Sequence, residues 1–165
     1  MNELVPNLIE ALREELTSYG EMLALLDHQQ EIVMLRRTHD LLGSVASINA
    51  QSQIINTIRR EREERQRKIA RRLGLIDNAP LTQILPRLPE DYRPLVQALV
   101  QENNQLLVRV QQRARQNHLL LTRVVELMQR FINSLFPGLN PSTYNDAGRL
   151  LALGAPQQSL YNAVG

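Results

Sequence analysis

The sequence predicts an all-α fold, an elongated antiparallel bundle of three long, coiled-coil-like helices with a short connector helix and a flexible C-terminal tail. Apolar residues recur at helical spacing through most of the 165 residues. No stretch alternates apolar and polar residues as a half-buried strand would. The composition is 43% hydrophobic but only 4% aromatic, which suits the seams between helices better than the core of a β-sandwich. Turn signals between the segments indicate an up-and-down order.

Two long helices are expected in the first half of the chain, over about 4–37 and 40–73. In both, apolar residues recur three or four positions apart, as on one face of a helix. Thr38 or Asp40 would cap the second helix, because their side-chain oxygens can accept from the free N–H groups of a first turn. Gly74 provides its C-terminal stop.

The strongest pattern follows a connector, residues 75–88, in which one short turn of helix is expected around 81–85. A third helix is expected over 89–136, where apolar residues recur every seven positions. Such a helix would be about 70 Å long, so the two earlier helices must pack along it. Its seam repeats through Val96, Asn103, Val110, Asn117, Val124 and Phe131, through Leu99, Leu106, Arg113, Leu120, Leu127 and Ser134, and through Val100, Leu107, Ala114, Leu121, Met128 and Leu135.

The third helix should stop at Pro137-Gly138, yet the chain continues to residue 165. We therefore expect a helical bundle domain over 1–136 and a flexible amphipathic tail over 137–165. Gly154-Ala155-Pro156 would break any helix in the tail and leave two short apolar pieces on a hinge. The apolar side chains of these pieces are Leu150, Leu151, Leu153, Leu160, Tyr161 and Val164.

Two asparagines, Asn103 and Asn117, occupy seam positions of the third helix. One interpretation is control of register, because a buried Asn needs a polar partner and penalises slipped pairings. The other is a polar part of the seam that is left for a partner helix. The sequence keeps both interpretations open.

No catalytic residue, metal site or cofactor is expected, and we predict that the protein is not an enzyme. The chain has no cysteine, which excludes disulfides, thiolate metal sites and a cysteine nucleophile. The pairs Asp27-His28 and His39-Asp40 could each be half of a catalytic dyad. Neighbouring residues on a helix do not face each other, however, and no hydrolase, zinc-protease or phosphate-loop motif accompanies them.

The run RREREERQRKIARR, residues 59–72, raises nucleic-acid binding as an alternative, because basic residues along one helix face can neutralise phosphates. Glu61, Glu63 and Glu64 interrupt the run, several of them three or four residues from an arginine. That spacing is typical of intrahelical ion pairs on a solvated face. Aromatic residues for base stacking are missing nearby, so we expect no nucleic-acid partner.

The N-terminal stretch MNELVPNLIEALREEL carries acids where a signal peptide needs positive charge. No apolar run approaches the ~18 residues needed to span a bilayer. The absence of cysteine fits a reducing compartment. We therefore expect a soluble cytoplasmic protein without direct membrane insertion.

The stretch VQQRARQNHLLLTRVVELMQRFINSLFPG, followed by STYNDAGRL, resembles the FlgN family of flagellar export chaperones. That family has an Asn followed by a Leu pair on its long helix, and beyond the helix a Thr-Tyr, a Gly and often a basic residue. The first half is similar more loosely, through Tyr19 and Met22–Leu26, and Gly43 departs from the pattern. The residues that carry the resemblance are Asn117, Leu119, Leu120, Leu121, Thr143, Tyr144, Gly148 and Arg149.

The resemblance implies binding rather than catalysis. Such chaperones are small cytoplasmic helical bundles that hold the aggregation-prone terminal helices of hook-associated proteins and dock on the cytoplasmic domain of the type III export gate. By resemblance, the expected contact with the gate is made by Thr143, Tyr144, Gly148 and Arg149. The expected client-binding side chains, which would grip a helix, are Leu150, Leu151, Leu153, Leu160, Tyr161 and Val164.

A structural coiled-coil scaffold is the alternative hypothesis. The tail would then be a strap whose apolar side chains pack on the chain's own core. The heptads could be satisfied within one chain or partly by a second copy, so a homo-oligomer is a further possible partner. The sequence does not indicate which hook-associated protein is the client.

Overall fold

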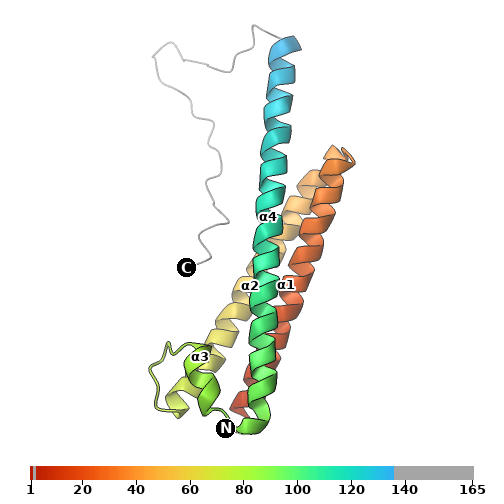
Figure 1. Cartoon of the computed structure of the whole chain (residues 1–165). Helices are drawn as coiled ribbons and strands as arrows, with labels where there is room; N and C mark the ends of the chain where they lie inside the picture. Colours follow the sequence, from red (N-terminus) through yellow and green to blue (C-terminus); the bar gives the residue numbers. More distant parts are fainter. Residues whose placement is uncertain (2, 136–165) are drawn as a thin grey trace, which may run out of the picture. The chain divides into compact units, whose positions relative to one another are not determined.

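The computed structural model describes residue 1 and residues 3–135 (Figure 1). Within these residues the elements are the long helices α1 (Leu4–Met34), α2 (Thr38–Arg72) and α4 (Arg93–Leu135), the short helix α3 (Leu81–Ile84), and the 3-10 turns η1 (Leu85–Arg87) and η2 (Glu90–Tyr92). The described residues contain no strand, so the predicted all-α class is confirmed. None of the described helices is long and apolar enough to cross a membrane.

The chain divides into two compact units, Met1–Thr122 and Arg123–Gly165, of which the second is described as far as Leu135. Helix α4 contributes residues to both units. Helices α1, α2 and α3 belong wholly to the first unit, so the core described below is the core of that unit.

Helices α1 and α2 form an antiparallel hairpin within the first unit. Near the hairpin turn, the Gln29 amide donates to the Ser44 hydroxyl across 3.3 Å. Far from the turn, Arg65 donates to the carbonyl oxygen of Asn7 across 2.8 Å. The late residues of α1 therefore meet the early residues of α2, and the early residues of α1 meet the late ones.

Helix α4 runs in the same direction as α1. Asn103 donates to the carbonyl oxygen of Leu12 across 2.9 Å, and Asn117 donates to the carbonyl oxygen of Leu26 across 2.7 Å. In both hydrogen bonds the two residues are 91 positions apart in the sequence. A constant separation of this kind is the mark of two helices that run in parallel.

The connector between α2 and α4 is part of the core. Ile84 of α3 is fully buried, and Leu88 retains 1% of its exposure. Both side chains belong to the main apolar cluster, where they meet the starts of α1 and α4 and the end of α2. The fully buried and nearly fully buried members of that cluster are Val5, Leu8, Leu12, Ile69, Ala70, Ala79, Ile84, Leu88 and Val96.

Helices α1 and α2 end in the same backbone motif with different residues at its left-handed position. At the end of α1 this residue is Arg36, with φ 56°, and at the end of α2 it is Gly74, with φ 68°. In each case the next residue donates from its backbone N–H back into the last turn, from Arg37 to Ile32 and from Leu75 to Ala70, across 2.9 Å. This is the Schellman arrangement, in which glycine is the usual left-handed residue.

Exchanging residues at these two helix ends should change stability in opposite directions. Arg36→Gly should raise the free energy of unfolding by about 0.5–1 kcal/mol, because glycine adopts a positive φ without a Cβ penalty. Gly74→Ala should lower it by about 1 kcal/mol, although a Cβ at Gly74 would meet no atom within 4 Å. Urea denaturation followed by circular dichroism measures both changes.

The matched control is Gly20→Ala, in the middle of α1, where a Cβ also meets no atom within 4 Å. There the backbone is helical, so alanine should stabilise the protein by up to about 1 kcal/mol. Equal effects of alanine at Gly20 and Gly74 would contradict the assignment of strain to the left-handed position.

Candidate interaction surface on helix α4

The first part of the α4 seam is buried against α1. Val96 is fully buried, and Leu99, Asn103 and Asn117 retain 7%, 6% and 3% of their exposure. The amide of Asn103 also donates to the Leu99 carbonyl of its own helix across 3.0 Å. Burial of these side chains holds α4 on α1 within the first unit.

The two seam asparagines face the chain's own α1 helix. Besides its bond to Leu26, the Asn117 amide donates to the side-chain oxygen of Gln29 across 3.2 Å. The side-chain N–H groups of both asparagines therefore donate to α1, as the register interpretation of the sequence requires, while their Oδ1 atoms are buried without a hydrogen-bond partner among the described residues. Neither asparagine is presented to a partner helix.

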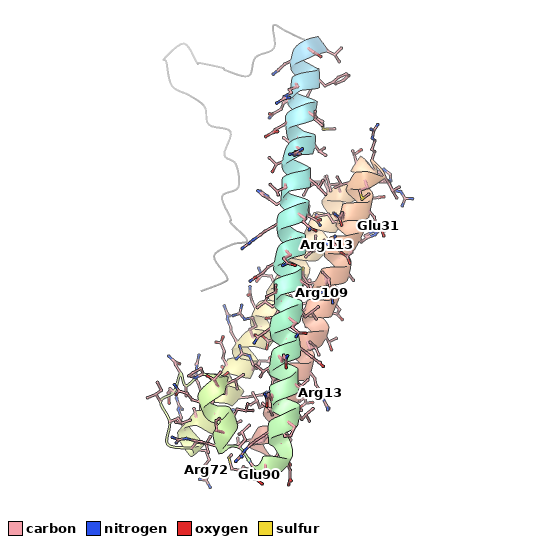
Figure 2. All side chains as sticks on the ribbon, in the orientation of Figure 1. Arg13, Glu31, Arg72, Glu90, Arg109 and Arg113 are labelled. Atoms are coloured by element: carbon pink, nitrogen blue, oxygen red, sulfur yellow. The ribbon has the colours of Figure 1, made fainter. Side chains whose placement is uncertain are left out.

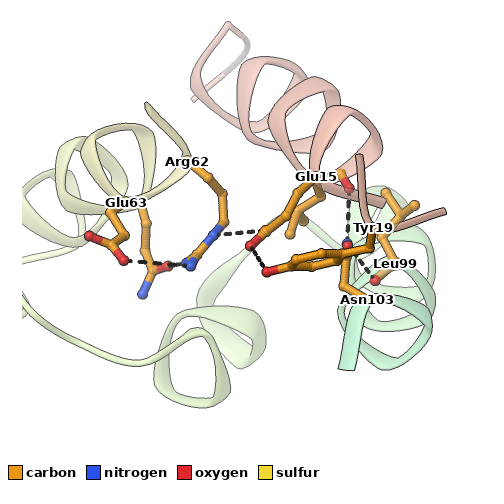
Figure 3. A network of polar contacts seen from close by, with 8 residues as sticks. Glu15, Tyr19, Arg62, Glu63, Leu99 and Asn103 are labelled. Atoms are coloured by element: carbon orange, nitrogen blue, oxygen red, sulfur yellow. Dashed lines mark hydrogen bonds and ion pairs between the residues drawn. The ribbon is translucent and has the colours of Figure 1, made fainter. Parts of the chain in front are cut away.

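A buried ion pair joins α1 and α2 beside Asn103 (Figure 3). Arg62 Nε lies 3.0 Å from Glu15 Oε2, with 15% and 7% of the two side chains exposed. The Tyr19 hydroxyl donates to Glu15 Oε1 across 2.9 Å, and Arg62 donates to Gln66 across 2.7 Å. Burial, and then the neighbouring Glu15 carboxylate, raise the pKa of Tyr19 above its usual value.

The arginine-rich run of α2 is held largely by contacts within the chain. Besides the Arg62 pair, Arg71 makes two hydrogen bonds to Asp77, of 2.8 and 2.6 Å. These bonds lower the pKa of the Asp77 carboxyl. Arg67 lies 3.8 Å from Glu63 on the same helix, an intrahelical pair of the kind that the sequence pattern predicts.

The Asp-His pairs that could have been half of a dyad are surface features. Arg113, on the side of α4 that faces α1 (Figure 2), places its Nε 2.6 Å from Asp27 Oδ1. His39 Nε2 lies 3.2 Å from Asp40 Oδ1, with 79% and 45% of the side chains exposed. In the described part of the chain, no three His, Asp or Glu residues are grouped so as to hold a metal ion.

The last part of the α4 seam is exposed. Within the second unit, Leu127 and Phe131 are each 63% exposed, although both occupy seam positions of the heptad. The burial that the heptad predicts for these two positions is therefore not found. We call this surface the exposed seam, and its members are Val125, Leu127, Met128, Phe131, Ile132 and Leu135, all between 51% and 63% exposed.

The exposed seam has the composition of a helix-binding surface. Its apolar side chains recur three or four residues apart, so they share one broad face of the helix. Residues 131–135, FINSL, carry no charge, and Arg123, Glu126 and Arg130 bring both signs before them. An amphipathic helix without a partner can bind another helix by burying such a face. The heptad pattern predicted seam positions for Leu127, Met128, Phe131 and Leu135, because such a pattern records apolarity and not burial.

The tail residues that the sequence singles out lie outside the described residues. They are the predicted gate contacts Thr143, Tyr144, Gly148 and Arg149, and the predicted client-binding residues Leu150, Leu151, Leu153, Leu160, Tyr161 and Val164. Their roles stay predictions.

Comparison with known proteins gives one family. The model of the family described as FlgN protein matches residues 1–152. The match includes Thr143, Tyr144, Gly148 and Arg149 but ends before Leu160. No curated protein and no solved structure matches the chain.

Removing one partner of the buried ion pair should destabilise the first unit strongly. Arg62→Ala should lower the free energy of unfolding by about 3 kcal/mol, because it leaves the buried Glu15 carboxylate without its ion-pair partner. The double variant Glu15→Leu/Arg62→Met should recover most of the loss, since apolar residues of similar size can replace a buried pair. Arg60→Ala, on the exposed side of the same helix, is the control. A loss at Arg60 as large as that at Arg62 would refute the argument.

The raised pKa of Tyr19 predicts a loss of stability in alkali. The unfolded chain releases the phenolic proton near pH 10 while the folded chain keeps it, so this contribution is complete below pH 10 and is lost as pH rises above it. The difference in unfolding free energy between the protein and Tyr19→Phe should therefore change by up to about 1.4 kcal/mol per pH unit above pH 10. A difference that stays constant between pH 8 and pH 11 would contradict this.

Proposed function

This chain belongs to the FlgN family of flagellar export chaperones, and we propose that it works in the cytoplasm, binding the helical termini of hook-associated proteins and delivering them to the export gate. A role in flagellar assembly follows from the family. The identity of the clients, the delivery step and the location are parts of the proposal.

The observation that carries the proposal is the exposed seam. Leu127 and Phe131 continue a heptad whose earlier positions are buried or half-buried, yet they are each 63% exposed. Burying a side chain of this size fully is worth about 1.5–3 kcal/mol, so a surface of six such residues can hold a helix. A client helix with its own apolar stripe would complete the seam in the way that α1 completes the earlier part.

The tail extends this surface in the proposal. The exposed seam ends at Leu135, and residues 150–164 add the six apolar tail residues predicted to hold clients. Between them lie Thr143, Tyr144, Gly148 and Arg149, the proposed contact with the export gate. The family match reaches through these four residues, which supports an assignment shared by the family.

The remaining helices supply the scaffold. We take residues 1–136 as an antiparallel three-helix bundle domain and 137–165 as the binding tail. Burial of Val96, Ile84 and Leu88 in one cluster and the ion pair of Arg62 with Glu15 support a bundle that keeps its form when a client binds. No cofactor is needed for binding of this kind.

Charge placed on the exposed seam should remove client binding. In the full-length protein, Met128→Asp/Phe131→Asp should weaken binding of a terminal helical peptide from a hook-associated protein at least tenfold, because the carboxylates would have to be buried against apolar residues. Isothermal titration calorimetry measures the affinity, and the melting temperature of the first unit should stay within 2–3 °C, roughly the effect of a surface change.

The control is Gln129→Asp, which adds one of the two negative charges, but beside the exposed seam. Unchanged client affinity in the double variant would refute the proposed surface. If the double variant instead loses only self-association in sedimentation equilibrium, the exposed seam is a contact between copies of the chain, which is the scaffold alternative. Tyr144→Ala separates the two proposed contacts, because it should weaken binding to the cytoplasmic gate domain and leave client affinity unchanged.

A further inference from the structure

A groove runs between the connector and α4 within the first unit. Its volume is about 390 Å³, and Leu81, Leu85 and Val100 contribute its apolar lining. These three side chains are half-buried. The rim is made by the polar residues Thr82, Gln97, Gln101, Asn104 and Gln105.

The connector creates this groove by the way it packs. Ile84 and Leu88 point into the core and are almost fully buried, which fixes the orientation of α3 and η1. Leu81 and Leu85 lie three residues before Ile84 and Leu88 on the same face, and they pack against the edge of the main apolar cluster. They are therefore held beside Val100 of α4 and are only partly covered.

The lining of the groove contains no charged residue. In a chain in which 22% of residues are charged, a surface made only of Leu, Val, Thr, Asn and Gln selects for an uncharged occupant. A charged side chain placed there would lose hydration without gaining a partner. An apolar segment with amide and hydroxyl side chains could fill the groove and hydrogen-bond to its rim.

Such a segment is present in the same chain. After Arg149, residues 150–165, LLALGAPQQSLYNAVG, contain no Asp, Glu, Lys, Arg or His. They combine apolar side chains with Gln157, Gln158, Ser159 and Asn162, the same kinds of side chain that line the groove. The 14 residues between Leu135 and Leu150 can span up to about 46 Å when extended.

We propose that residues 150–165 dock in the groove lined by Leu81, Leu85 and Val100 of their own chain when no client is bound. Docking covers the apolar side chains of the segment and those of the groove together. The contact is small, so a client helix can displace it. The displacement of the docked segment by a client rests on the proposed function, because it requires that the segment also binds clients.

Paramagnetic labelling of the full-length protein tests the docking itself. The chain has no cysteine, so Ser159→Cys carries a single nitroxide label. The backbone amide signals of Leu81, Leu85 and Gln101 should lose more than half of their intensity, while those of Gly43 and Ser47 in α2 keep theirs. Undiminished signals at all three groove residues would overturn the proposal.

Variants in the tail show whether the contact is specific, and they leave the bundle residues untouched. With the label in place, Leu153→Asp/Leu160→Asp should restore the groove signals, and the control Gln157→Ala should not. Equal broadening in the double variant would overturn the proposal. So would broadening that appears only when labelled chains are mixed with unlabelled, isotope-enriched chains, because the occupant would then be a second copy.

The client assay separates this inference from the proposed function. Gln101→Glu/Asn104→Glu, two exposed changes on the rim, should release the segment and raise client affinity about threefold or more, whereas Gln112→Glu outside the groove should not. Groove signals that are broadened by the label while Met128→Asp/Phe131→Asp binds clients normally would support docking and sink the proposed function. Client binding that depends on the exposed seam, without broadening of the groove signals, would support the proposed function and overturn the docking.

Discussion

The first unit depends on two amide groups that α4 inserts against α1. Asn103 and Asn117 donate to the backbone carbonyls of Leu12 and Leu26 of α1. The two asparagines are 14 residues apart on α4, and the two leucines are 14 residues apart on α1. Valine and leucine can pack in several registers, but a slip of α4 along α1 would break both hydrogen bonds to the α1 carbonyls, and a buried polar group left unpaired costs about 1–3 kcal/mol. These two bonds therefore decide which heptad faces which turn of α1, and the Arg113 contact with Asp27 follows from that register.

The patterns of apolar residues and turn residues were enough to predict most of the fold. The heptad of α4 and the helical spacing in α1 and α2 are local properties, so the sequence was enough to predict an all-α chain. Gly74 marked the end of α2 because a left-handed backbone position favours glycine. Arg36 gave no such signal at the end of α1, since an arginine with φ 56° is set by the hairpin and not by its own preference.

Burial was the part that the sequence could not supply. Glu15 reads as a surface residue, yet it is 5% exposed, because an arginine 47 positions later in the sequence neutralises it across the hairpin. Phe131 reads as a core residue and is 63% exposed. In both cases the deciding factor is the tertiary environment of the side chain, which the local sequence pattern does not record. The groove beside Val100 was missed for the same reason.

The short link between α1 and α2 has a consequence for the order of folding. Contacts across this hairpin join residues as few as 15 positions apart, whereas those between α1 and α4 join residues 91 positions apart. Loop closure favours the nearer pairs, so we expect the hairpin to form first, and at the ribosome it can form before α4 has been synthesised. Until then Leu8, Leu12 and Leu26 lack their α4 partners, and the newly made hairpin is itself a protein with an uncovered apolar seam.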